Sequence, residues 1–355
     1  MTNTWSDISK PTFVINKQRA INNISQMAEK FNKSNTIFRP HFKTHQSLGV
    51  ANWFRKLGIN KISVSSVDMA LQFYNAGWKD ISIVFPFNQR EIHALNIISK
   101  EAKINILVED INTIEYLSKH NANSLGVFIK IDCGYNRTGI DVANYQEIRL
   151  LAQAIKKSPS LHLKGILSHF GNTYSARSRA EVMTIFNSGM QKMQNLKQAL
   201  SDEFPDLLIS LGDTPSASLA TDFSKVDEMR PGNFVFYDWM QVAIGSCETQ
   251  QLAAIMLCPI VAKHEDRNEL IIHGGAVHFS KEKGDHHFGA ITDISKGFSS
   301  LPIEGVSIKS LSQEHGIIKC NDAFFQKTKL GDLVGVIPIH SCLTANLMQQ
   351  NTLIY

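Results

Sequence analysis

The chain has 355 residues, enough for one large domain and a second, smaller one. With 43% hydrophobic and 19% charged residues, its composition is that of a folded globular protein and excludes a disordered or fibrous chain. The net charge of +4 comes without a dense run of lysine and arginine, so nucleic-acid binding is not predicted. No apolar stretch of about 18 residues exists, so no membrane span is expected.

Two features predict a cytoplasmic protein. The N-terminal residues 1–5 lack the basic and then apolar pattern of a secretory signal. The five cysteines are odd in number and widely separated: Cys133, Cys247, Cys258, Cys320 and Cys342. That distribution argues against a disulfide framework and indicates a reducing compartment.

Short apolar runs alternate with helical stretches over the first two thirds of the chain. The strand candidates are residues 13–15, 37–39, 62–64, 81–84, 104–108, 127–131, 163–167 and 207–210. In the segments between them, apolar residues recur at three- and four-residue steps, as in helices that pack on one face. The near-continuous Ile, Val and Leu runs are typical of strands buried on both faces. Evenly spaced units without a G-x-G-x-x-G turn favour a (β/α)8 TIM barrel over a doubly wound sheet.

The pattern changes after Gly245. The later apolar segments are short and β-rich, with Gly, Asp, Lys and Asn between them: residues 253–261, 270–272, 289–291, 306–308, 316–318 and 333–337. No long helical periodicity accompanies them. The sequence therefore predicts a C-terminal all-β domain at residues 246–355, after a barrel at residues 12–245.

A basic segment, residues 39–45, follows the second strand candidate. A lysine at a strand end, facing the mouth of a barrel, can hold pyridoxal phosphate as a Schiff base, and Lys43 has this position. Such a lysine must be neutral part of the time, which desolvation or flanking cations such as Arg39, His41 and His45 would favour. The alternative is a basic surface loop.

Polar side chains follow two further strand candidates. Arg137 comes just after the strand at 127–131, where its guanidinium could bind an oxyanion at the catalytic face of a barrel. His169 and Tyr174 follow the strand at 163–167 and could line a pocket. A surface arginine and an ordinary polar loop are the alternatives.

Two turns of small residues are candidates for binding the cofactor. Their residues are, in chain order, Gly212, Asp213, Thr214, Gly232, Asn233 and Tyr237. Backbone N–H groups and hydroxyls in such turns bind phosphate, which in barrels commonly lies at the loops after the last strands. Two ordinary turns are the alternative.

His340 and Cys342 follow the apolar run at 333–337. Residues two apart on an extended chain direct their side chains to the same side. Imidazole and thiolate together suit zinc, and two protein ligands would leave positions for water and substrate. Alternatively, the histidine is only hydrogen-bonded and the cysteine is a small buried hydrophobe.

Together these segments resemble the fold-type III pyridoxal phosphate enzymes, specifically the D-threonine aldolase and D-serine dehydratase family, from about Pro11 to Leu347. The most specific parts are residues 39–45, 212–215, 230–238, 312–316 and 338–342. The resemblance implies a (β/α)8 barrel followed by a β domain, and a homodimer with sites shared between subunits. It also implies pyridoxal 5'-phosphate and a divalent metal, zinc above all.

The resemblance implies roles for single residues: Lys43 as the Schiff-base lysine, Arg137 near the cofactor ring and substrate, Tyr174 as an active-site tyrosine, Gly212, Thr214, Gly232 and Asn233 in phosphate-binding loops, and His340 and Cys342 as metal ligands. The histidine-x-cysteine pair is similar to that of zinc-dependent D-serine dehydratases, whereas D-threonine aldolases tend to have aspartate at the second position. His273 and His278 depart from the aspartate-led turn expected there and are interpreted as structural.

The expected function is a lyase that converts a 3-hydroxy D-amino acid to a 2-oxo acid and ammonia, as a D-serine dehydratase does. One alternative is cleavage to glycine and an aldehyde, as by a D-threonine aldolase. Another is an amino-acid racemase, which needs a second base and no metal. A pyridoxal phosphate carrier is less compatible with the chain, because carriers that resemble this barrel usually lack the β domain.

Overall fold

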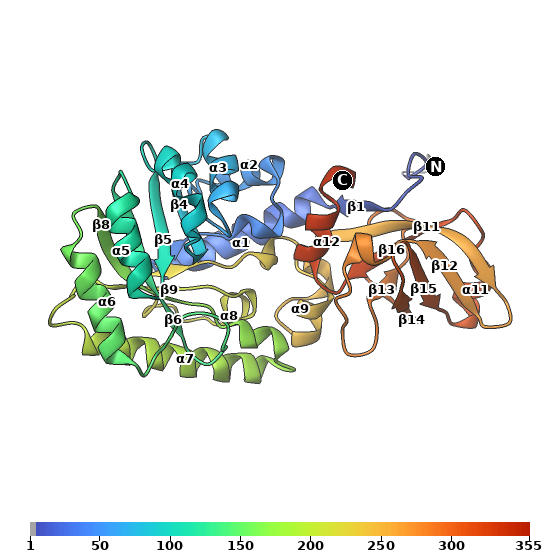
Figure 1. Cartoon of the computed structure of the whole chain (residues 1–355). Helices are drawn as coiled ribbons and strands as arrows, with labels where there is room; N and C mark the ends of the chain where they lie inside the picture. Colours follow the sequence, from blue (N-terminus) through green and yellow to red (C-terminus); the bar gives the residue numbers. More distant parts are fainter. Residues whose placement is uncertain (1–4) are drawn as a thin grey trace. The chain divides into compact units, whose positions relative to one another are not determined.

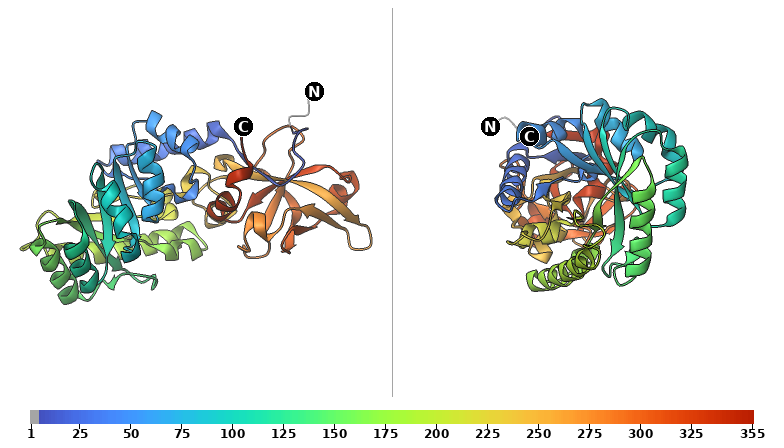
Figure 2. Two further views of the ribbon diagram at one scale, coloured as in Figure 1. Left: turned by 45° about the horizontal axis from the view of Figure 1, so that its top comes forward. Right: turned by 90° about the vertical axis from the view of Figure 1, so that its left-hand side faces the viewer.

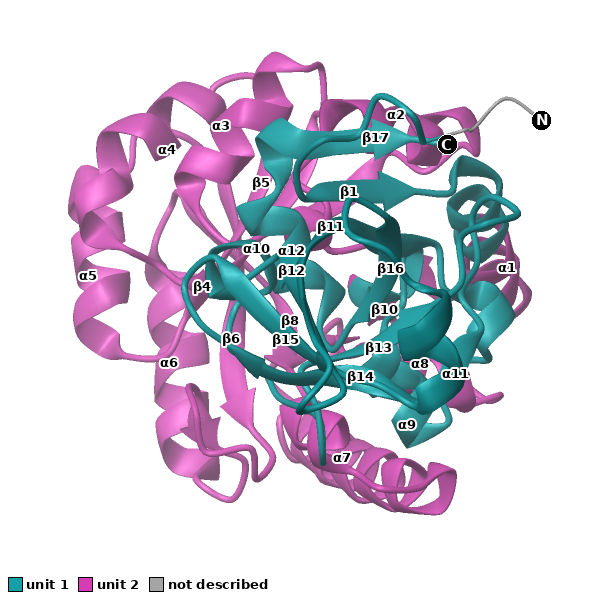
Figure 3. Ribbon diagram, turned by 90° about the vertical axis from the view of Figure 1, so that its right-hand side faces the viewer, with its two compact units in different colours: residues 1–24, 233–355 teal, residues 25–232 magenta. Residues whose placement is uncertain are grey.

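The computed structural model describes residues 5–355 and divides into two compact units (Figures 1 and 3). Unit 1 contains the chain up to Ile24 together with residues 233–355, and unit 2 contains residues 25–232. The domain limits predicted above, 12–245 and 246–355, stay a prediction. Residues 1–4, which make up most of the segment inspected for a secretory signal, lie outside the described residues.

Unit 2 is a nearly closed barrel of parallel strands, as predicted. The strands are, in the order in which they pair, β2 (Ile37–Phe38), β10 (Glu228–Met229), β9 (Leu208–Leu211), β8 (Leu161–Ser168), β6 (Leu125–Asp132), β5 (Lys103–Val108), β4 (Asp80–Pro86) and β3 (Lys61–Val64). An isolated parallel bridge between His41 and Ser63 joins the two ends of this path. A further short strand, β7 (Ile140–Asp141), pairs with β6.

The helices of unit 2 lie outside its strands (Figures 2 and 3). They are α2 (Leu48–Lys56), α3 (Val67–Asn75), α4 (Ile92–Ile98), α5 (Ile111–His120), α6 (Tyr145–Lys157), α7 (Arg179–Ala199) and α8 (Thr214–Leu219), with short 3-10 turns η1 (Phe42–Thr44), η2 (Gln89–Glu91) and η3 (Gly171–Ser175). Ser66, Asp110 and Ser178 each accept a hydrogen bond from the backbone N–H three residues on, which fixes where α3, α5 and α7 begin. A longer helix, α1 (Lys17–Lys33), begins in unit 1 and ends in unit 2.

Apolar side chains from five successive strands of the barrel pack together. They are Val84, Leu107, Phe128, Leu167 and Leu208. Each strand contributes one member, as a closed barrel requires when inward and outward residues alternate along every strand. Further residues of these strands are also buried, as Ile104, Ile106 and Val108 are in β5, so the strand segments read as almost continuous apolar runs.

The barrel also holds a buried ion pair. Nε of Arg39 lies 2.6 Å from Glu228, and its Nη1 lies 2.6 Å from Asp80. Arg39 and Glu228 are almost wholly buried, so each charge depends on the other for compensation. Arg39 is therefore a structural residue of the barrel, and the expectation that it flanks Lys43 as a free cation is corrected.

A second arginine extends this network. Ser210 donates a hydrogen bond of 2.7 Å to the other carboxylate oxygen of Glu228 and accepts one of 2.7 Å from Nε of Arg230. Arg230 also donates to the carbonyl oxygen of Ser168 at 2.8 Å. Burial lowers the pKa of Arg230 to about 10. Polar groups from three strands are thus satisfied inside the barrel rather than by water.

The strand predicted at residues 13–15 belongs to another sheet. It forms β1 (Thr12–Ile15), which pairs with strands of unit 1. The remaining place in the barrel is taken by β10, a two-residue strand that carries no apolar run and was not predicted. The apolar run of β1 is equally typical of a buried strand in an antiparallel sheet, so its pattern could not assign it to either unit.

Unit 1 is a mainly antiparallel sheet that closes on itself. Its order is β12 (Glu269–His273), β15 (His315–Lys319), β14 (Pro302–Leu311), β13 (Gly289–Thr292), β16 (Leu333–Pro338), β11 (Ala254–His264), β1 and β17 (Thr352–Ile354). Because β12 also pairs with β11, six of these strands form a closed ring. Short helices and turns lie between them: η4 (Asn233–Val235), α9 (Trp239–Ile244), η5 (Thr249–Gln251), α10 (Ala276–Phe279), α11 (Asp322–Lys327), α12 (Ser341–Leu347) and η6 (Gln349–Asn351). The predicted C-terminal β architecture is confirmed.

The buried Arg39–Glu228 pair generates the first prediction. Glu228→Gln keeps the side-chain volume but removes the charge that compensates Arg39. We expect the free energy of unfolding, measured by urea denaturation, to fall by about 3 kcal/mol. The matched control is Glu29→Gln, which breaks an exposed pair with Lys33 and should cost less than about 1 kcal/mol. Equal, small losses in both variants would contradict the structural role of the buried pair.

Candidate active site

Lys43 lies in η1, directly after β2. The ring of His41 caps this turn, because its Nδ1 accepts a hydrogen bond of 3.3 Å from the backbone N–H of Lys43. On either side of Lys43, the side chains of Phe42 and Thr44 are fully buried, whereas that of Lys43 is exposed. The neighbours therefore anchor the turn and leave the amine of Lys43 accessible at the end of a barrel strand.

The histidines near Lys43 are neutral. Burial, followed by the positive charge of Lys43, lowers the pKa of both His41 and His169 well below the ordinary value. Burial also lowers the pKa of His45 to about 3, and its ring stacks on Phe54. The expectation that His41 and His45 flank Lys43 as cations is therefore corrected, since uncharged imidazoles surround it instead.

The loops after β8 and β9 meet through two hydrogen bonds. Nδ1 of His169 bonds to the carbonyl oxygen of Gly212. The hydroxyl of Tyr174 accepts a hydrogen bond of 3.1 Å from the backbone N–H of Thr214. The rings of His169 and Tyr174 lie 6.3 Å apart between centroids. The structure thus brings together four of the residues that the sequence predicted for the site.

The start of α8 holds buried hydroxyls that could bind a phosphate. The first backbone N–H groups of α8 already donate hydrogen bonds within the protein: the N–H of Thr214 donates to Tyr174, and the N–H of Ser216 donates to Asp213 at 2.7 Å. Pro215 between them has no N–H group. In contrast, Oγ1 of Thr214, Oγ of Ser216 and Oδ2 of Asp213 are buried without a hydrogen-bond partner among the described residues. Two such hydroxyls fit a phosphate group, since each can donate a hydrogen bond to it. Burial raises the pKa of Asp213 to about 6.

Close packing accounts for the two predicted glycines. A Cβ at Gly212 would lie 2.9 Å from Nη1 of Arg230. A Cβ at Gly232 would lie 2.8 Å from the carbonyl oxygen of His41 and 2.9 Å from Oγ1 of Thr44. Both positions must therefore stay small so that Arg230 and η1 can pack, whether or not an anion is bound. Substituting them would disturb the barrel and is not a clean test of phosphate binding.

Arg137 lies in an exposed turn after β6. Its guanidinium carbon is 5.0 Å from the centre of the ring of Tyr135, and that ring is 5.8 Å from the ring of His169. Oδ1 of Asp132 holds the turn by accepting hydrogen bonds from the backbone N–H groups of Gly134 and Tyr135. Tyr135 thus connects Arg137 to the histidine beside Lys43, a role that the sequence gave no reason to expect.

The predicted metal ligands lie in unit 1, where a buried aspartate holds them. His340 ends the loop after β16, and Cys342 lies in the first turn of α12. Nδ1 of His340 is 3.2 Å from Oδ2 of Asp238, which also accepts hydrogen bonds from Ser341 N–H and from the amide of Asn233. Asp238 is almost fully buried and was not among the predicted site residues.

This arrangement prepares His340 to bind a metal. A carboxylate beside Nδ1 keeps the proton on that nitrogen and leaves the Nε2 lone pair for a cation. Burial lowers the pKa of His340, but the neighbouring Cys342 and Asp238 raise it well above its usual range, so the ring carries a positive charge that a bound metal would replace as it displaces the proton. The donor set of imidazole nitrogen and sulfur fits zinc.

The other two predicted cofactor residues lie near Asp238. The amide of Asn233 reaches Asp238 at 2.5 Å, Ser341 at 3.2 Å and the sulfur of Cys342 at 3.6 Å. Tyr237 is buried and has a left-handed backbone, with φ of 51°. Within unit 1 the structure therefore brings Asn233 to the predicted metal pair. A role of either residue in binding the cofactor stays a prediction.

No helix within residues 5–355 combines the length and the apolar character that crossing a membrane demands.

The chain matches solved and characterised proteins over nearly its whole length. It is 24% identical to D-threo-3-hydroxyaspartate dehydratase of Delftia sp. (strain HT23), over 97% of this chain and 93% of the relative. It is 26% identical to D-serine dehydratase of Dictyostelium discoideum, over 96% and 92%. A structure of D-threo-3-hydroxyaspartate dehydratase, a cysteine-to-alanine mutant in the metal-free form, superimposes with a TM-score of 0.88 at 23% identity, over 96% of this chain and 93% of that one.

Two family models match in succession along the chain. Residues 15–238 match the alanine racemase N-terminal domain, and residues 253–354 match a putative serine dehydratase domain. The first match alone covers more than half of the chain. The protein therefore belongs to the family built on the alanine racemase N-terminal domain, in the form that continues into a serine dehydratase domain.

Proposed function

We propose that this protein is a pyridoxal phosphate- and metal-dependent lyase acting on 3-hydroxy D-amino acids. The substrate loses water across Cα and Cβ, and the resulting enamine hydrolyses to a 2-oxo acid and ammonia. The observation that carries this proposal is the His340–Cys342 pair held by Asp238, because a racemase needs no such metal site. The dehydratases among the relatives support it.

The barrel residues would hold the cofactor and move the proton. Pyridoxal phosphate supplies an electron sink for negative charge at Cα. Nζ of Lys43, exposed at the end of β2, would hold it covalently and, when released, take the Cα proton as a base. The hydroxyls of Thr214 and Ser216 would donate hydrogen bonds to its phosphate, and Tyr174 would keep the loop of Thr214 in place.

The residues of unit 1 would hold the metal. Nε2 of His340 and the sulfur of Cys342 would be the ligands, and a divalent cation held there would supply positive charge for a departing hydroxide. Asp238 orients the imidazole, and Asn233 contacts both Asp238 and the sulfur. On the resemblance described above, we further infer a homodimer with shared sites, and the free cysteines support a cytoplasmic location.

A comparison of substrates and products tests this function. D-serine, D-threonine and D-3-hydroxyaspartate are each incubated with the holoenzyme, and both product sets are measured. The dehydratase proposal expects a 2-oxo acid and ammonia in equal amounts. Glycine with an aldehyde would indicate the aldolase alternative, in which the Cα–Cβ bond breaks instead. Inversion of configuration at Cα, with neither product set formed, would indicate a racemase.

Lys43→Ala tests the covalent link. After borohydride reduction and proteolysis, mass spectrometry of the wild type should find the cofactor on the peptide that contains Lys43, and the variant should carry none. Lys56→Ala, at an exposed lysine of nearby α2, is the control and should label like the wild type. A reduced adduct on another lysine in Lys43→Ala would show that the assignment is wrong.

Thr214→Val and Ser216→Ala test the phosphate site. Each removes a buried hydroxyl, and losing a hydrogen bond to a charged group should weaken pyridoxal phosphate binding by about tenfold or more. The affinity for pyridoxal, which lacks the phosphate, should not change. Ser224→Ala, at an exposed serine, is the control. An equal loss for both ligands would mean that the hydroxyls only support the loop.

Asp238→Asn tests the orientation of His340. Asparagine has the same shape and can still cap α9, where Oδ1 accepts the N–H of Gln241 at 3.1 Å. Without the carboxylate, zinc affinity should fall by about 10- to 100-fold. Competition with a chromophoric chelator measures it, and circular dichroism checks the fold. Unchanged zinc affinity would exclude a role for Asp238 in metal binding.

A further inference from the structure

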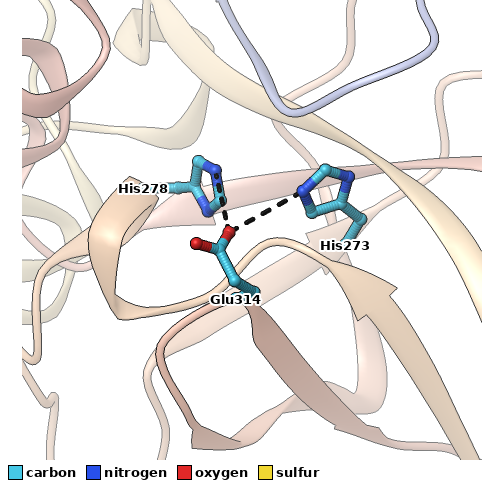
Figure 4. Close-up of side chains that lie close together, drawn as sticks. All are labelled: His273, His278 and Glu314. Atoms are coloured by element: carbon cyan, nitrogen blue, oxygen red, sulfur yellow. Dashed lines mark ion pairs between the residues drawn. The ribbon is translucent and has the colours of Figure 1, made fainter.

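His273, His278 and Glu314 converge in unit 1, although the proposed function uses none of them. His273 ends β12, His278 lies in α10, and Glu314 directly precedes β15. One ligand atom from each lies within 4.8 Å of the other two. Figure 4 shows the carboxylate facing both imidazole rings, and each Nε2 is 3.8 Å from Oε2 of Glu314.

The backbone fixes this cluster in place. The N–H groups of Gly274, Ala276 and Val277 donate hydrogen bonds to the carbonyl oxygens of residues 314, 312 and 313, at 2.9, 2.7 and 3.2 Å. Gly275 lies so close to Gln313 that a Cβ there would overlap its carbonyl group. The segment with the two histidines is therefore tied directly to the segment with the glutamate, so the backbone positions that carry the three donors are fixed relative to one another.

We propose that His273, His278 and Glu314 bind a divalent transition-metal ion, at a site separate from the His340–Cys342 pair. Two imidazoles and one carboxylate are the donor set of zinc, nickel, copper and ferrous iron. Water can complete the coordination, because the side chains of His273 and Glu314 are 41% and 49% exposed. The interpretation of both histidines as merely structural is revised accordingly.

The protonation state of His278 determines which proton and which hydrogen bond a bound metal ion must displace. Burial lowers its pKa, so the ring is neutral near pH 7, which is the form that binds metals. Its Nδ1 accepts a hydrogen bond of 3.1 Å from Gly275 N–H, so its proton is on Nε2 and faces Glu314. A metal on Nε2 moves that proton to Nδ1 and releases the N–H of Gly275. This exchange is a cost that metal binding at the site must offset.

Cobalt binding tests the proposal. In the full-length holoenzyme carrying His340→Ala and Cys342→Ala, one equivalent of Co²⁺ should bind and produce a visible ligand-field spectrum without a sulfur charge-transfer band. Adding His273→Ala or Glu314→Gln should weaken this binding by at least the roughly tenfold loss typical of perturbed metal sites. His264→Ala and Glu304→Gln, a histidine and an exposed glutamate of unit 1 outside the cluster, are the matched controls.

The same comparison in the chain with His340 and Cys342 intact makes the test independent of the double variant's folding. There, elemental analysis after equilibrium dialysis in Co²⁺ should show one equivalent fewer in Glu314→Gln than in Glu304→Gln. Equal metal content, or equal cobalt affinity in the cluster variants and their controls, would overturn the proposal and leave an ordinary contact between two histidines and a glutamate. Because the measurement is of binding, a lack of lyase activity would refute the proposed function without affecting this result.

Discussion

Closure of the parallel barrel is the constraint on which the candidate site depends. The path of strands runs from β2 to β3, and the bridge between His41 and Ser63 joins its ends. Because all these strands are parallel, the segments that follow them gather at one end of the barrel. Lys43, Tyr174 and Thr214, which are far apart in the sequence, therefore belong to one set of loops. The buried Arg39–Glu228 pair stabilises this closure, since it spans β10 and the end of β2, where the strands are shortest.

Asp238 has the corresponding role in unit 1. Its two oxygens contact four groups: the imidazole of His340, the N–H of Ser341, the amide of Asn233 and, through Oδ1, the N–H of Gln241 in the first turn of α9. A single buried carboxylate thus positions one proposed metal ligand, the start of helix α12, which carries the other proposed ligand, and the start of the neighbouring helix α9. A second cluster in the same unit, His273, His278 and Glu314, has the composition of a metal site but different ligands. An experiment on metal binding by this protein must therefore distinguish the two proposed sites.

The sequence predicted the barrel because alternating apolar runs and helices reflect burial on both strand faces, and seven of the eight expected barrel strands are present. It failed at β1 and β10, where a short apolar run and a two-residue strand carry no information about their partners. Although their roles stay a prediction, the positions of Lys43, His169 and Tyr174 at strand ends were predictable because each follows an apolar strand. Three other residues of the candidate site could not be predicted, because only three-dimensional packing reveals their contacts. Ser216 has a buried hydroxyl, Asp238 has a carboxylate shared by distant groups, and Tyr135 has a ring contact with His169.

The measurement that tests the central claim most directly is turnover of a 3-hydroxy D-amino acid before and after metal is removed and returned. The account predicts that chelation leaves pyridoxal phosphate bound but abolishes release of the 2-oxo acid, and that zinc restores it. Cys342→Ala should retain the cofactor and stay inactive after zinc is added, because the sulfur ligand is missing. Full activity of a preparation shown by elemental analysis to be free of metal would contradict the account.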